Sequence, residues 1–127
     1  MDYGSSSALT IESVRLALGA SDLRQRVIAD NIANVNSPDH VRMRVVFEER
    51  LSQALATMQS SNSEGAAEAG SLDGVQAELE PDYTGRRIEL DDEMAQLSAN
   101  SLRYHALTKG LSRYLSIANI VVSPSRG

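Results

Sequence analysis

The sequence predicts a mainly α-helical protein in which long N- and C-terminal helices pair as an antiparallel hairpin or coiled coil. Two observations predict this fold class. Apolar residues recur at alternating spacings of three and four at both ends of the chain, and the middle is rich in Ser, Gly, Ala and Glu without such a pattern. A chain of 127 residues has room for one domain. We therefore expect an N-terminal helical part (1–37), an irregular, partly disordered middle (38–88) and a C-terminal helical part (89–127) that together form one core.

The first helix is predicted over about residues 8–34. Three serines, Ser5 to Ser7, offer N-cap oxygens, and Pro38 ends the helix because the residue before a proline is pushed out of the α region. The apolar seam expected on this helix consists of Leu9, Leu16, Ala20, Leu23 and Val27.

The middle changes character twice. Partial alternation over 41–47 favours an extended piece, and residues 48–55 favour a short helix with Leu51 and Leu55 on one face. Residues 60–74 combine Ser, Gly and Glu with no aromatic side chain, which is typical of a loop or a disordered segment.

The second long helix is predicted to begin near Asp91 and Asp92, which can cap it, with Glu93 placed favourably at the positive end of the helix dipole. Gly110 lies inside it at a cost of about 1 kcal/mol. The seam expected on this helix has polar interruptions at two positions and consists of Met94, Leu97, Ser101, Tyr104, Thr108, Leu111, Leu115, Ala118 and Val122.

A two-helix hairpin buries only one stripe on each helix. Further apolar residues, such as Ile11, Leu18, Leu102 and Ile117, lie off both seams and would stay exposed on a monomer, which soluble proteins usually avoid. Small domains are already marginal in the surface that they bury. We therefore infer an assembly subunit whose helices acquire neighbours from other chains.

Composition argues against several function classes. The chain has no Cys and only two imidazoles, His40 and His105, so no metal site is expected, and the acidic run at 91–93 is explained by helix capping. There is no Gly-x-Ser-x-Gly elbow and no Gly-rich phosphate loop, so we expect no enzyme and no cofactor.

Charge and hydropathy constrain the partners and the route. Residues 51–92 carry nine acidic and two basic groups, a net charge of −7, whereas 93–127 carry four basic and one acidic, a net charge of +3. No basic stripe suits nucleic acid. No apolar run is long enough to span a bilayer, and the polar N-terminus lacks the features of a cleavable signal peptide.

The end of the first helix carries a recognisable motif. Asn is a weak helix former whose side chain competes for backbone groups, so a cluster of Asn before Ser-Pro is by itself ordinary turn chemistry. The order of the residues, however, resembles the signature of flagellar rod and hook proteins, Ala-x-Asn-Ile-Ala-Asn-x-Asn-Thr-Pro-Gly-Tyr. Asp39 and His40 stand in place of its final Gly-Tyr, and the matching positions are Ala29, Asn31, Ile32, Ala33, Asn34, Asn36, Ser37 (for Thr) and Pro38.

The second helix adds to this resemblance. The segments 88–97, which contains Met-Ala-x-Leu, and 100–107, which begins Asn-x-Leu-Arg-Tyr, are similar to the C-terminal part of the proximal rod family of the FlgB type. The resemblance covers about residues 8–55 and 85–122. It implies a structural subunit of the flagellar basal-body rod, whose terminal helices pair and whose copies pack helically into a hollow tube across the periplasm.

The resemblance also implies partners and a route: other rod proteins, the basal-body rings and export gate, and type III export without a cleaved signal. Two alternatives stay open, a neighbouring rod protein of the FlgC type and a small helical secretion chaperone or adaptor. Because Asn31 and Asn34 continue the first seam beyond Val27, we expect their amides to face a protein interface and to find backbone partners where the chain turns at Ser37-Pro38.

Overall fold

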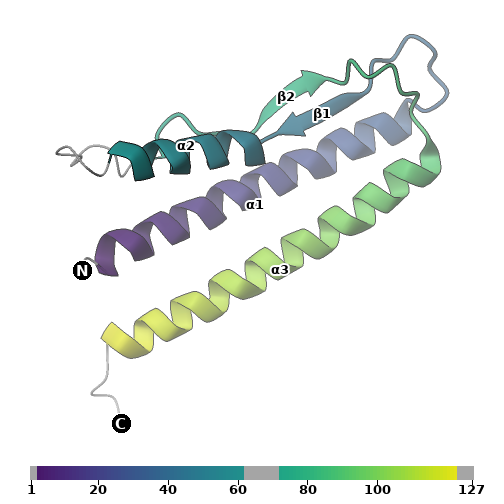
Figure 1. Cartoon of the computed structure of the whole chain (residues 1–127). Helices are drawn as coiled ribbons and strands as arrows, with labels where there is room; N and C mark the ends of the chain where they lie inside the picture. Colours follow the sequence, from purple (N-terminus) through teal and green to yellow (C-terminus); the bar gives the residue numbers. More distant parts are fainter. Residues whose placement is uncertain (1–2, 62–71, 123–127) are drawn as a thin grey trace.

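The computed structural model describes residues 3–61 and 72–122, and two long helices dominate it. Helix α1 spans Tyr3–Ala33 and helix α3 spans Leu90–Val122, and they run along each other (Figure 1). Ser21 bonds Asn100 while Asn31 bonds Glu93, so the residue numbers rise on one helix as they fall on the other. The predicted antiparallel helical pair is therefore confirmed.

The middle segment contains three short elements. Strand β1 is Met43–Val46, helix α2 is Glu48–Ser61 and strand β2 is Glu78–Pro81. β1 and β2 form a two-stranded antiparallel ribbon with Arg44 opposite Glu80, and the ribbon and α2 run along α1 (Figure 1). The extended piece expected over 41–47 contains β1, and the helix expected over 48–55 is α2, which continues six residues further.

Strand β2 lies in a part of the middle where the sequence indicated no particular element. Its sequence, Glu-Leu-Glu-Pro, has low strand propensity, but its acidic side chains meet cations: Glu80 pairs with Arg44 at 3.1 Å and Glu78 with Arg50 at 2.5 Å. Most of the loop expected over 60–74 lies outside the described residues, but Leu72, within that range, is buried.

The interior of the described chain is small and unusually polar. Its buried apolar side chains are Ala20, Val27, Ile28, Phe47 and Leu72. Four polar residues are equally buried: Ser21, Asn31, Glu93 and Asn100. A buried polar group costs free energy unless it is hydrogen-bonded, so the partners of these four residues decide how α1, the ribbon and α3 fit together.

Candidate functional site

The guanidinium of Arg42 joins three separate segments near the end of α1 and the start of α3. The side chain of Arg42, just before β1, donates from Nε to Glu93 Oε1 at 2.8 Å and from Nη1 to Asp82, just after β2. Its Nη2 lies 3.7 Å from Asp92 Oδ2. Glu93 is fully buried at the start of α3. Arg42 therefore ties one end of the ribbon, where β1 begins and β2 ends, to the start of α3.

The pKa values of Arg42 and Asp82 are both shifted in the direction that favours their charged forms. Burial alone would lower the pKa of Arg42, but its bonds to Glu93 and Asp82 outweigh this and raise that pKa above its ordinary value. The pKa of Asp82 falls to about 2, chiefly because the Thr84 hydroxyl and backbone N–H donate to its Oδ1 at 2.7 and 3.0 Å, with Arg42 contributing further. Arg42 and Asp82 therefore stay ionised over the whole physiological pH range.

The side-chain amide of Asn31 hydrogen-bonds the edge of β1 that faces away from β2, as a further strand would. Its Nδ2 donates to Met43 O at 3.2 Å, while Met43 N–H donates to its Oδ1 at 3.4 Å, so the side chain pairs with the Met43 peptide as another peptide group would. The same Nδ2 lies 3.4 Å from Glu93 Oε2. Asn31 thus connects α1 to β1 and to α3 at once, and no apolar side chain could make these bonds.

Arg24, seven residues before Asn31, covers the next part of the same β1 edge. It donates to Val45 O at 3.4 Å and forms a two-point ion pair with Glu48 at the start of α2, in which Nη1 lies 2.6 Å from Oε1. Burial would raise the pKa of Glu48, but the bond from Arg24 and the Glu48 backbone N–H outweigh this and lower it. α1 therefore holds both β1 and the first turn of α2.

A second polar contact lies further along the hairpin. Ser21 Oγ donates to Asn100 Oδ1 at 3.0 Å, and Asn100 Nδ2 donates to Ser21 O at 2.8 Å and to Gln25 Oε1 at 3.0 Å. Asn100 is the first residue of the Asn-x-Leu-Arg-Tyr segment. The hydrogen bonds of the Asn100 amide fix the register of α3 along α1.

The structure places the other signature residues differently. Asn34 is half-buried and bonds its own helix, from Nδ2 to Asp30 O at 2.8 Å. Ile32 is half-buried, and five signature positions are exposed: Ala29, Ala33, Asn36, Ser37 and Pro38. The expectation that Asn31 and Asn34 find partners at the Ser37-Pro38 turn is wrong: Asn31 reaches the ribbon and α3, and Asn34 closes the last turn of α1.

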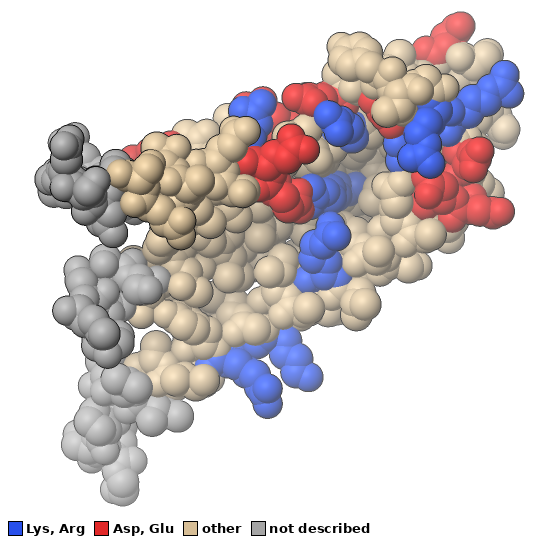
Figure 2. All heavy atoms as spheres, in the orientation of Figure 1, with Lys and Arg blue, Asp and Glu red and all other residues tan. Residues whose placement is uncertain are grey.

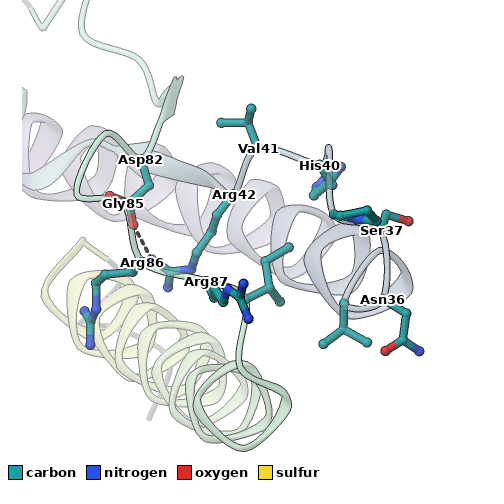
Figure 3. A pocket seen from close by; sticks show the side chains of 12 residues that line it. Asn36, Ser37, His40, Val41, Arg42, Asp82, Gly85, Arg86 and Arg87 are labelled. Atoms are coloured by element: carbon teal, nitrogen blue, oxygen red, sulfur yellow. Dashed lines mark hydrogen bonds and ion pairs between the residues drawn. The ribbon is translucent and has the colours of Figure 1, made fainter.

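A cleft of about 510 Å³ lies between the loops 35–42 and 82–88 (Figure 3). Arg42 forms one wall, and Arg86 and Arg87 extend from the second loop. His40, which stands where the family signature has Tyr, approaches Asp30 with 3.5 Å between Nε2 and Oδ2. Within residues 3–61 and 72–122, no group of three or more His, Cys, Asp or Glu side chains is arranged to hold a metal ion.

The predicted seams are exposed to different degrees in the single chain. On α1, Ala20 and Val27 are buried and Leu9, Leu16 and Leu23 are half-buried. On α3, Leu97, Leu111 and Ala118 are half-buried, whereas Met94, Tyr104 and Leu115 are 45–47 % exposed, and nothing is described for the side chain of Val122.

The stripe of least exposure on α3 departs from the expected seam at one of the two seam positions in each heptad, where it lies one residue earlier. It passes through Glu93, Asn100, Leu107 and Tyr114, spaced seven apart, together with the half-buried seam residues. On the sequence alone, Glu93 was explained by helix capping and the helix dipole and Asn100 was given no packing role, yet their heptad spacing with Leu107 and Tyr114 was a readable signal. Whether the original seam contacts neighbouring chains stays a prediction.

The charged side chains of this region are largely paired. Acidic and basic residues lie side by side over the ribbon and the adjoining loops in Figure 2, in agreement with the pairs Arg44–Glu80 and Arg50–Glu78. None of the helices in the described parts of the chain is long and apolar enough to cross a membrane.

Comparison with known proteins agrees with this architecture. The chain is 32 % identical over 130 residues to the flagellar basal body rod protein FlgB of Borrelia hermsii, covering 90 % of this chain and 96 % of that protein. It is 27 % identical to the FlgB proteins of Bacillus subtilis, with 81 % of this chain and 84 % of the relative covered, and of Borreliella burgdorferi, with 83 % and 89 % covered. No family model and no solved structure matches the chain. The identity to a relative covered over almost its whole length shows that this chain belongs to the FlgB family of flagellar basal body rod proteins.

Proposed function

We propose that this chain is a structural subunit of the proximal rod of the bacterial flagellar basal body, where its copies contribute to the hollow shaft that transmits torque across the periplasm. Relatives that carry the name FlgB and align over most of the chain carry this proposal. The relatives give no support to the neighbouring FlgC type.

The structure supplies a physical reason for a role in assembly. Within residues 7–60 and 72–119, only five apolar side chains are buried, while large apolar ones such as Leu102 and Ile117 remain 72 % and 63 % exposed on α3. Exposed apolar surface of this kind marks contact sites. A chain that buries so little by itself gains stability when its neighbours cover the rest.

The rod assignment brings further proposals. The partners are further copies of this chain, other rod proteins and the components of the basal-body rings and export gate, and the chain reaches the periplasm through the flagellar export apparatus with its N-terminus uncleaved. It performs no catalysis, in keeping with a family of structural proteins.

The test is to delete the gene in the host bacterium and to complement it with an epitope-tagged copy. We expect the deletion strain to be non-motile, and the tagged chain to co-purify with isolated basal bodies at its full encoded mass. A soluble dimer that is absent from the basal bodies but still required for the secretion of other rod proteins would instead identify a chaperone or adaptor.

A further inference from the structure

Both long helices carry a second stripe that nothing in the described chain covers. On α1, opposite the contacts with α3, alternating spacings of four and three connect Ala8, Glu12, Arg15, Gly19, Asp22, Arg26, Ala29 and Ala33. On α3, the same alternation connects Ala95, Ala99, Leu102, Ala106, Lys109 and Arg113, and Ile117 follows one turn later. All these positions are exposed except Glu12, which is half-exposed. Such spacing is that of a coiled-coil seam.

The stripe on α3 combines large apolar residues with charge of one sign. Leu102 and Ile117 are among the most exposed apolar side chains of the described chain. After Glu93, α3 contains Arg103, Lys109 and Arg113 and no acidic residue. Figure 2 shows basic side chains without acidic neighbours along the edge where α3 lies. A partner for this face must therefore offer apolar contact and carboxylates.

The stripe on α1 offers apolar contact and carboxylates, and it also has an open space at Gly19, here called the notch. Its carboxylates are Glu12 and Asp22, whose side chains are 45 % and 58 % exposed; within α1, Glu12 lies 3.8 Å from Arg15 and Asp22 lies 2.9 Å from Arg26. Gly19 lies between them, and a Cβ added there would meet nothing within 4 Å. Glycine inside a helix costs about 1 kcal/mol relative to alanine, and no contact with the described part of the chain requires a glycine here. The free space fits the side chain of another molecule.

The residues of the two stripes also match in their position along the axes of the paired helices. Ser21 of α1 lies level with Asn100 of α3, as their hydrogen bonds show. Counting two residues away from this pair along the antiparallel helices brings Gly19 level with Leu102, and counting nine brings Glu12 level with Lys109. If a second copy lies beside the first at the same height, its Leu102 meets the Gly19 notch and its Lys109 meets Glu12.

We propose that the outer stripe of α1 binds the outer stripe of α3 of a second copy of this chain, with Leu102 seated over Gly19 and Lys109 paired with Glu12. This inference rests on the proposed rod function and names the contact by which copies join. The two stripes differ and lie on different helices, so the contact is heterologous. Such contacts repeat from copy to copy into a ring or an open helical array, as a tube requires.

Disulfide trapping tests the contact directly, because the natural chain contains no cysteine. Asp22 and Ala99 are exposed and each lies one residue from the Ser21–Asn100 pair, so the proposed contact brings them together across two copies. Cells that produce Asp22→Cys and Ala99→Cys chains together should yield a cross-linked dimer in oxidised basal bodies. Each variant alone should not, and neither should Asp22→Cys with Ser98→Cys, whose cysteine lies beside the stripe.

A charge swap gives a second, independent readout. Lys109→Glu should lower the fraction of flagellated cells at least about tenfold, because facing like charges strongly disfavour an interface. Glu12→Lys in the same chain should restore that fraction to near the parent value. Failure of Glu12→Lys to rescue would overturn the pairing.

The notch is tested at Gly19 itself. Gly19→Leu should raise the helix content of the purified chain, since the site is open and glycine disfavours helix, yet it should abolish incorporation into the rod, with Gly19→Ala as a milder control. A Gly19→Leu chain that assembles like the parent would overturn the proposed contact. If the parent chain is present in basal bodies but the mixed disulfide is missing, only this contact fails. If the parent chain is absent from them, the rod assignment fails, and the contact fails with it.

Discussion

The ion pair between Arg42 and Glu93 offers the most decisive test of how the fold is held together. Replacing Arg42 by Met keeps a side chain of similar length and removes its charge. Glu93, fully buried at the start of α3, then loses the only cationic partner that it has among the described residues, at 2.8 Å, and keeps the Asn31 amide at 3.4 Å. The variant therefore leaves a buried carboxylate without a counter-charge, which is far more costly than losing an exposed ion pair.

The expected size follows from this burial. Removing one partner of a buried ion pair costs about 3–5 kcal/mol, and small domains have only about 5–15 kcal/mol of stability in total. Arg42→Met should therefore lower the free energy of unfolding by a large part of its total. Urea unfolding followed by circular dichroism at 222 nm measures this as a lower transition midpoint with an unchanged slope.

A matched double variant separates the charge from the packing. In Arg42→Met/Glu93→Met both charges are absent, and two apolar side chains occupy the space between the ribbon and α3. Replacing a buried pair is often neutral, so the double variant should recover most of the stability that Arg42→Met loses, except for the bond from Arg42 to Asp82, which it also lacks. An Arg42→Met chain as stable as the parent would show that Glu93 reaches solvent or another cation, and the reasoning would fail.

Further predictions concern neighbouring groups. The pKa of Asp82 is about 2 in the folded chain and higher when unfolded, so its ionised carboxylate stabilises the fold fully above pH ~4, and this stabilisation is lost as the pH falls towards 2. Acid titration followed by circular dichroism should show this loss, and Asp82→Asn should flatten the dependence of stability on pH over that range. Asn31→Leu leaves the Met43 peptide and Glu93 without an amide partner and should cost about 1–3 kcal/mol in urea unfolding. Asn34→Leu should cost less than ~1 kcal/mol, because among the described residues the Asn34 side chain bonds only the nearby Asp30. Asn100→Ala removes three bonds to α1 and should lower the melting temperature, while an alanine at the exposed Ser98 leaves it unchanged.

Long periodic patterns explain why the fold class could be predicted from sequence. A 3/4 spacing that persists over several heptads has few alternatives to a helix, so α1 and α3 were expected near their observed bounds. β2 could not be predicted in this way. Its Glu-Leu-Glu-Pro sequence disfavours a strand, and it exists because β1 offers Arg44 opposite Glu80 and α2 offers Arg50 to Glu78, which are tertiary facts.

The candidate site was only half visible in the sequence. The motif singled out Asn31, but its partners, Met43 and Glu93, lie 12 and 62 residues away, and no local pattern links them. Arg42 and Asp82 each lie just beyond the strand ends, and only the ribbon's register brings them together. The turn at Ser37-Pro38 was a reasonable local expectation that the long-range pairing overruled.

The polar contacts also answer a question that the apolar seams leave open, namely which register the two helices adopt. Leu and Ala repeat at heptad positions on both helices, so sliding α3 by seven residues would still oppose apolar to apolar. Such a slide would bring Asn100 level with the buried Ile28 instead of Ser21, leaving its amide unpaired at a cost of about 1–3 kcal/mol. It would also separate Glu93 from Asn31 and Arg42. These buried groups therefore select one register at some cost in stability, as polar residues on a helical seam can. That register sets Leu102 level with Gly19, so the same bonds that align the hairpin would also align each copy with the next.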